Sequence, residues 1–338
     1  MVFSTSSASR PIGAAIDSLL FTRRQFVECS FCAIKAIHHS KHTALPAQRV
    51  IDEVVVLARR FGVKRFSFLD VNFFDDRNRA LQIATGFAHH GLDLGWDAFA
   101  RIDQFSVYSN HDLALLARGG CRTVSVGVET ASQSQLDAIK EDLTISETRG
   151  FVERLAGSGI RICANIMLGL PGDTRGEFLA TVELARWIRM QNPNNTFAFY
   201  PFSPIPGTLA YGRVIDAEDD LLAMDVLNLG LGTYYGPLTR MRWLDRKDER
   251  AIKAAVWTLF PYYFAPDDHR PKPFSFRGLK FGFQHAMARF RVEHEIYGVP
   301  LRWWIRRAEL SLKRRVMRWR MRSAKLRSGA TETKKQAA

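Results

Sequence analysis

The chain has 338 residues, of which 46% are hydrophobic, enough for one large domain with an appendage or for two ordinary domains. Its four cysteines exclude a disulfide scaffold, and we find neither a signal peptide nor a stretch long enough to span a membrane, which predicts a cytoplasmic protein. The formal net charge is +14, but residues 301–338 alone hold thirteen Lys and Arg against two Glu. The charge therefore belongs to the tail, where no motif indicates a specific nucleic-acid site.

Short runs of β-branched or aromatic residues alternate with helical patterns between about residues 18 and 200, as in repeated βα units around a parallel sheet. The predicted strands are Leu19–Arg23, Arg65–Val71, Gly95–Ala100, Thr123–Val128, Arg161–Leu168 and Asn195–Tyr200. Helices are predicted from Pro46 to Gly62 and over about 77–90, 110–118, 146–158 and 175–190. Periodicity leaves open whether this sheet is doubly wound or a partial barrel.

After Tyr211 the alternation stops, and helices are predicted over 216–229, 245–259 and 280–297. We therefore divide the chain into a poorly ordered segment (1–17), the α/β domain (18–212), a helical region (213–300) and a basic amphipathic helix with tail (301–338). Apolar residues of the last part form one helical stripe, which comprises Leu301, Trp304, Ile305, Ala308, Leu312, Val316 and Trp319. Such a helix is suited to contact an anionic membrane surface through 301–327, or to dock on the α/β domain.

Cys29 and Cys32 follow the first predicted strand with two residues between them. Thiolates at this spacing can share one metal ion or cluster. The pair alone is a weak signal, because a redox pair, half a zinc site or two unligated cysteines would have the same spacing.

Polar residues also stand where other strands end. Asp70 and Asn72 follow the second strand, Glu129 follows the fourth, and a Gly- and Pro-rich stretch from Gly169 to Asp173 follows the fifth. Ligands of parallel βα folds bind at the carboxyl ends of the strands, so we expect these residues to lie on the same side as the cysteines. A carboxylate at this position can instead cap the next helix, which we expect of Asp173.

Four segments together resemble the radical S-adenosylmethionine (SAM) superfamily, in particular its branch with a cobalamin-binding domain in front of the barrel. They are Cys29-Ser-Phe-Cys32, Gly127-Val-Glu129-Thr-Ala-Ser with Leu136-Asp137 after it, Met167-Leu-Gly-Leu-Pro-Gly-Asp173, and Phe202-Ser-Pro-Ile-Pro-Gly-Thr208. The resemblance covers about residues 18–212. It implies a partial (β/α)6 TIM-like barrel, here with an α-helical C-terminal extension, and thereby decides between the two sheet types.

The resemblance further implies a [4Fe–4S] cluster and SAM as cofactors, with reductive cleavage of SAM to a 5′-deoxyadenosyl radical. Cys29 and Cys32 would be the second and third cluster ligands. Glu129 would contact the ribose or methionyl part of SAM, and Asp70 and Asn72 would line the neighbouring side. Gly169 and Gly172 would let the backbone approach the adenine.

One position departs from the family pattern, because Gln25 stands where the first of three cluster cysteines is expected. Glutamine is a poor iron–sulfur ligand compared with thiolate. Cys121 and Cys163 fall at or near the starts of their strands, away from the ligand side, and are predicted to be small apolar packing residues. A histidine ligand from His38, His39 or His42 is conceivable, although a solvent-exposed loop fits these residues better.

We therefore expect a radical SAM enzyme that acts on a small-molecule substrate of unknown identity and receives electrons from a donor such as ferredoxin or flavodoxin. The aromatic-rich region 197–304 suggests an apolar substrate. Cobalamin would have to come from a missing or separate domain, since seventeen residues before the first strand cannot hold one. The alternative is a degenerate or truncated barrel that binds SAM or a partner without a functional cluster; a zinc protein ranks last.

Overall fold

The computed structural model describes residues 16–19, 29–32, 44–139, 143–205, 207–214, 241, 243–265, 271, 274–298, 311 and 315. The predicted helix at 216–229 lies outside these residues, as do the predicted N-terminal segment up to residue 15 and all of the tail except two positions. Within the described part, no helix is long and apolar enough to cross a membrane.

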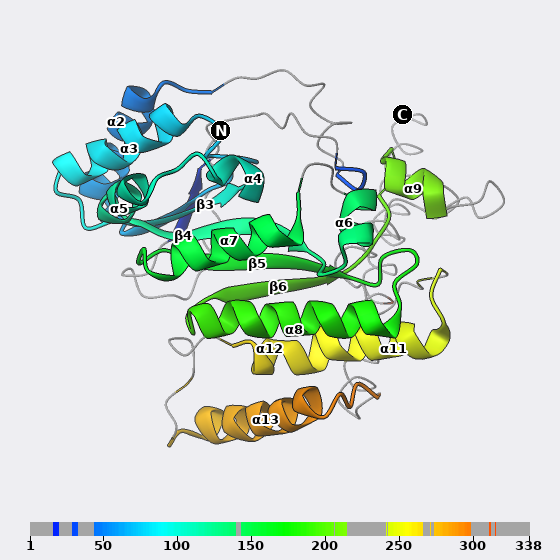
Figure 1. Ribbon diagram of the computed structural model, residues 1–338. Coiled ribbons are helices and arrows are strands. Elements are labelled where there is room, and N and C mark those ends of the chain that lie inside the picture. The colour runs from blue at the N-terminus through cyan, green and yellow to red at the C-terminus, as the bar shows by residue number, and fades with distance from the viewer. Residues whose placement is uncertain are drawn as a thin grey trace, which may run out of the picture.

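Six parallel strands form one sheet, and their order in space is their order in the sequence (Figure 1). The strands are β1 (Ile16–Leu19), β2 (Arg65–Phe68), β3 (Gly95–Ala100), β4 (Cys121–Glu129), β5 (Arg161–Leu168) and β6 (Thr196–Pro201). A doubly wound sheet reverses direction at a switch point, whereas this order never reverses, so every right-handed crossover places its helix on the same face. The predicted partial barrel is confirmed.

Helices cover one face of the sheet (Figure 1). The principal ones are α2 (Ala47–Phe61), α3 (Arg77–His89), α5 (Asn110–Arg118), α7 (Ile145–Ala156) and α8 (Arg175–Gln191). Their ends follow from local chemistry: Gly62 ends α2 in the left-handed conformation, and Ser109, Thr144 and Thr174 each form a capping box with the acidic residue three positions later.

The sheet has a covered face and a concave face, because successive side chains of a strand point to opposite sides. Residues on the covered face are buried against the helices, and they include Phe66, Phe68, Trp96, Val124, Val126, Ile162, Ala164 and Ile166. Aromatic rings dominate this core at β2 and β3, where Phe68 stacks on Phe73 at 4.4 Å between ring centroids. Residues on the concave face remain partly exposed, as the alternating burial of β5 shows.

The C-terminal extension packs on the outer face of β6. It comprises α11 (Arg246–Ala254), the π-helical segment η3 (Ala255–Leu259), α12 (Phe260–Tyr263) and α13 (Phe276–Glu293). The ring centroids of Phe260 and Phe264 lie 4.5 and 4.9 Å from that of Phe199 on β6. α13 forms the outermost layer, beyond α11 and α12 (Figure 1).

Several boundaries differ from the predictions. β1 begins at Ile16, three residues before the predicted strand and two before the predicted domain boundary at residue 18. α13 begins at Phe276, not at residue 280, because Ser275 caps it by accepting a hydrogen bond from the Gly278 amide. The short helices α4 (Ile102–Phe105), α6 (Gln133–Ile139) and α9 (Leu209–Val214) were not predicted, since each is too short for a periodic pattern.

Candidate cofactor site at the strand ends

The cysteine loop is a tight turn held mainly by backbone hydrogen bonds. The Cys32 amide donates to the Cys29 carbonyl at 3.1 Å, which brings the two ends of the turn together. The Ser30 amide donates to the Ile139 carbonyl at 2.9 Å, and the Ala210 amide donates to the Ser30 carbonyl at 2.8 Å. The loop is therefore fixed between the end of α6 and the start of α9.

A small apolar cluster joins three of the four segments that the sequence singled out. Its buried members are Ile139, Leu170, Phe202 and Ala210, and Phe31 of the cysteine loop packs against it together with Met167 and Trp243. The cysteine loop, the stretch after β5 and the segment after β6 thus meet at the carboxyl edge of the sheet. This is the side on which parallel βα folds bind ligands.

Arg101, directly after β3, is a site residue that the sequence reasoning missed. It is only 5% exposed, and its Nη1 lies 3.9 Å from the Cys29 sulfur. Its Nη2 and Nε donate to Asp103 Oδ2 at 2.9 and 3.3 Å. A buried cation placed beside a thiol favours the negatively charged thiolate, which is the form that binds metal.

Asp70 and Asn72 follow β2 closely but differ in their surroundings. Asp70 is completely buried and interacts electrostatically with Arg79 of α3. Burial lowers the pKa of Arg79, and the charge of Asp70 opposes that effect. Asn72 donates its Nδ2 to Gln104 Oε1, while its buried Oδ1 has no hydrogen-bond partner among the described residues. The Oδ1 of Asn72 can thus accept a hydrogen bond from a ligand.

Glu129 has an unusual backbone conformation. It ends β4 at φ 65°, where a residue other than glycine is strained, and the strand register shifts between Gly127 and Glu129. Hydrogen bonds tie the following turn to α8: the Ala131 amide donates to Thr181 Oγ1 at 3.0 Å, and Ser132 Oγ donates to Glu177 Oε1 at 2.8 Å. These bonds offset the strain and hold Glu129, which is itself largely buried, at the strand end.

Glu129 shares the concave face with Tyr200 of β6. Burial raises the pKa of the Tyr200 hydroxyl, and the charges of Cys163 and Glu129 raise it further. Cys163 is the third residue of β5 and Cys121 the first of β4, so both stand toward the amino ends of their strands. Cys121 is buried, and burial raises the pKa of its thiol. Neither cysteine joins Cys29 and Cys32.

Asp173 closes the glycine-rich loop after β5 instead of capping the next helix. Its Oδ2 accepts hydrogen bonds from the Gly169 and Leu170 amides at 2.8 and 2.9 Å, and Thr174 supplies the helix cap. The prediction that Asp173 caps the helix is wrong, because threonine one position later forms the capping box. Burial raises the pKa of Asp173 to about 6, although its two backbone hydrogen bonds oppose the shift.

The two glycines of this loop have positive φ angles, 77° at Gly169 and 83° at Gly172. A Cβ on Gly169 would lie 2.9 Å from Met241 Cε, and Trp243 Nε1 donates to the Gly169 carbonyl at 2.8 Å. The positive φ thus favours glycine at 169, and a side chain there would displace the end of Met241. The approach of adenine to this loop stays a prediction.

The concave face of the sheet carries polar side chains within the strands as well as at their ends. Ser67 donates to Asp97 Oδ1 at 2.9 Å, and Asn165 donates to Ser125 Oγ at 3.0 Å. Burial raises the pKa of Asp97, and Ser67, Arg65 and Arg161 oppose that shift. The described interior of the half-barrel therefore offers hydrogen-bonding groups from β2 to β5.

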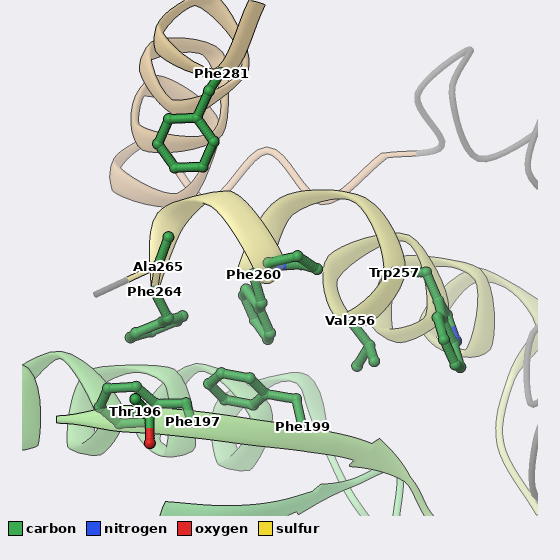
Figure 2. A pocket seen from close by; sticks show the side chains of 10 residues that line it. Thr196, Phe197, Phe199, Val256, Trp257, Phe260, Phe264, Ala265 and Phe281 are labelled. Atoms are coloured by element: carbon green, nitrogen blue, oxygen red, sulfur yellow. The ribbon is translucent and has the colours of Figure 1, made fainter. Parts of the chain in front are cut away.

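A hollow of about 650 Å³ lies outside the barrel between β6 and the C-terminal helices (Figure 2). Most of its lining is aromatic: Phe197, Phe199, Trp257, Phe260, Phe264 and Phe281. The aromatic residues that suggested an apolar substrate thus belong in large part to the outer packing of β6. These six residues pack between β6 and the C-terminal helices and not around the strand-end residues.

Comparison with known proteins agrees with this geometry. Residues 22–185 match the family model of the radical SAM superfamily. An uncharacterized methyltransferase of Pyrococcus horikoshii is 30% identical over 198 residues, which are 58% of this chain and 41% of the relative. The chain therefore spans about two fifths of the length of that relative.

Two solved structures share the fold. The radical SAM methyltransferase TsrM of Kitasatospora setae, with tryptophan and a SAM analogue bound, matches 60% of this chain and 39% of its own at 19% identity and a TM-score of 0.50. The cobalamin-dependent radical SAM enzyme OxsB matches 83% of this chain and 50% of its own at 12% identity and a TM-score of 0.50. Most of the half-barrel, residues 22–185, thus matches the radical SAM superfamily, and the solved structures share its fold.

Proposed function

We propose that this chain is the catalytic barrel of a radical SAM enzyme that uses a [4Fe–4S] cluster and SAM. The observation that carries the proposal is the meeting of the cysteine loop with the segments after β5 and β6 around one apolar cluster. Arg101, 3.9 Å from the Cys29 sulfur, adds the end of β3 to the same place. Two relatives of this chain are named as methyltransferases, so methyl transfer is the first reaction class to test.

Cys29 and Cys32 would hold the cluster, which when bound supplies the electron that cleaves SAM to methionine and a 5′-deoxyadenosyl radical. Their turn fits this role, since thiolates two residues apart in a fixed loop can bind neighbouring irons. Arg101 would offset part of the negative charge of the thiolates. Across the described residues, no three His, Cys, Asp or Glu side chains gather as one metal site, so a third ligand would have to come from elsewhere.

Glu129, Asn72 and Asp70 would serve SAM. The Glu129 carboxylate can accept hydrogen bonds from ribose hydroxyls or from the amino group of the methionyl part. The buried Oδ1 of Asn72 offers a further acceptor. Asp70, which is buried and interacts with Arg79 of α3, would fix the position of the segment after β2. Gly169 and Gly172 would flank the adenine.

The substrate would be a small molecule, and the polar concave face favours one with hydrogen-bonding groups over a purely apolar one. The electron would come from a donor such as ferredoxin or flavodoxin. Contact of 301–327 with a membrane surface also stays a proposal, one that rests on sequence alone.

Anaerobic reconstitution with iron and sulfide tests the proposal, with visible absorbance and electron paramagnetic resonance as readouts for the cluster and 5′-deoxyadenosine as the readout for SAM cleavage. We expect Cys29→Ala and Cys32→Ala to abolish cluster uptake and Cys163→Ala to leave it unchanged. Q25C should increase cluster loading. Equal uptake by all these variants, or no uptake by the natural chain, would refute the proposal.

The second candidate is a degenerate barrel that binds SAM without a cluster, and the pairing of only two thiolates favours it. It predicts SAM binding in equilibrium dialysis with neither iron uptake nor 5′-deoxyadenosine. Stoichiometric zinc without SAM binding would instead indicate a zinc protein.

A further inference from the structure

α13 carries two apolar faces, and only one of them is used within the described fold. On the inner face, the Phe281 ring lies 5.8 Å from that of Tyr262, and His285 Nδ1 lies 2.9 Å from the Tyr262 carbonyl. Ala288 and Val292 of the same face are buried in the main core. Figure 2 shows Phe281 directed from α13 toward the C-terminal end of α12.

The opposite face of α13 is also apolar. Phe276, Phe283 and Phe290 recur every seven residues, with Leu279 and Met287 between them. At 100° per residue, this outer stripe lies half a turn away from the stripe that packs on α12. Its residues are 45% to 84% exposed, and Phe274, just before the helix, is 98% exposed.

Positive charge borders the outer stripe. Lys280 and Arg291 lie along one side of it by the same helical rotation, and Arg277 lies farther round the helix on that side. The Arg291 side chain already donates to the carbonyls of Ile296 and Gly298, which keeps its charge near the end of the helix. On the other side, the charge of Arg289 is compensated by Glu293, whose Oε1 lies 2.9 Å from Arg289 Nε.

We infer that the outer stripe of α13 docks on an anionic lipid surface. A helix that presents phenylalanine and leucine to one side with basic residues beside them suits the boundary between lipid headgroups and acyl chains. α13 is the outermost layer of the described fold, so nothing described beyond it would obstruct a flat surface (Figure 1). The chain's own tail has an apolar stripe as well, but its thirteen Lys and Arg against two Glu would repel the cations beside the stripe of α13, which favours an anionic surface over the tail.

Vesicle cosedimentation with the full chain tests this inference. The vesicles contain phosphatidylcholine with roughly one third phosphatidylglycerol, and vesicles of phosphatidylcholine alone serve as the comparison. We expect partitioning to the anionic vesicles only, weakening as salt is raised. F283S/F290S should lower the partition coefficient about tenfold, because apolar contact and charge attraction act together at such a surface.

F61S/V107S is the matched control, since Phe61 and Val107 are 62% and 63% exposed and lie outside α13, against 66% and 55% for Phe283 and Phe290. It should leave partitioning unchanged, and neither double variant should lower the unfolding midpoint in the absence of lipid. Equal partitioning of the natural chain and F283S/F290S would overturn the inference. A lower midpoint in F283S/F290S alone would show that the chain covers its own stripe, and a loss of dimer mass in light scattering would show that a second copy does; either result would overturn it.

Discussion

Asp173 accepts two backbone hydrogen bonds in a site where burial outweighs them, so its pKa rises to about 6 from 3.8. A carboxyl group with a raised pKa in the folded state binds its proton more tightly there than in the unfolded chain. Its contribution to stability is therefore complete below pH 3.8 and disappears as the pH rises through 6.

This sign gives a prediction for Asp173→Asn, which keeps an oxygen acceptor for Gly169 and Leu170 but cannot titrate. Between pH 7 and pH 5, the natural chain should gain about 1 kcal/mol of unfolding free energy relative to the variant. Urea unfolding of both proteins at the two pH values measures the difference. A pH dependence that is the same in both proteins would contradict the prediction.

Single residues also show where sequence reasoning stops at this site. Cys29, Cys32 and Glu129 were proposed because they follow predicted strands and match the motifs of the family that the sequence resembles. Arg101 was missed because one arginine after a strand has no distinguishing pattern, and only the fold brings it to the Cys29 sulfur. The role of Asp173 was missed because both it and Thr174 are good caps, and the structure alone shows which one the helix uses.

The turn after β4 depends on α8, an element that follows it by about fifty residues. Thr181 Oγ1 accepts from the Ala131 amide and donates to the Glu177 carbonyl at 2.9 Å. Thr181→Val keeps the shape of the side chain but leaves that amide without its acceptor, which should cost about 1–3 kcal/mol of unfolding free energy.

Thr148→Val is the matched control. Thr148 is also buried, but its Oγ1 donates only to the Thr144 carbonyl, which keeps the Thr148 amide as a donor. Chemical denaturation should therefore show a cost of less than about 1 kcal/mol at this position. Equal losses of unfolding free energy in both variants would mean that the hydrogen bond from Ala131 to Thr181 contributes no more to stability than the local hydrogen bond of Thr148.

Among the elements, long strands and helices were predictable and short ones were not. β3 and β5 match their predicted bounds. Buried and more exposed side chains alternate along both strands, and this alternation is the pattern by which a strand is predicted. β1 was predicted three residues late, since a four-residue strand shows almost no alternation. The start of α13 was predicted four residues late. Its cap, Ser275, directly follows a proline-rich stretch, so the sequence did not show it clearly as the start of a helix.

At the scale of the whole molecule, the C-terminal helices form the cover of the last strand. β6 has no strand on its outer edge in the described part of the sheet, and Phe260 is 1% exposed between Phe199 and Phe264. Phe260→Ala should lower the unfolding free energy by about 3–5 kcal/mol, because it leaves a cavity in this packing.

Phe61→Ala provides the comparison, since Phe61 is exposed at the end of α2 and its truncation should cost within about 0.5 kcal/mol. Thermal and urea unfolding of the two variants would separate them. Loss of the signal from the barrel core and from the C-terminal tryptophans in one transition would show that the cover and the barrel unfold together. The sequence predicted a helical extension but not its position, because nothing in a helical pattern indicates which strand it packs against.

The turn between Cys29 and Cys32 owes its shape to main-chain atoms, since the Ser30 amide and carbonyl bond to Ile139 and Ala210. Substitution of a side chain leaves such bonds in place. The conformation of the loop therefore depends little on its side chains, whereas its chemistry depends on the two cysteine side chains. Conformation and ligand count can thus diverge independently in this barrel, so a preserved turn is no measure of preserved redox chemistry.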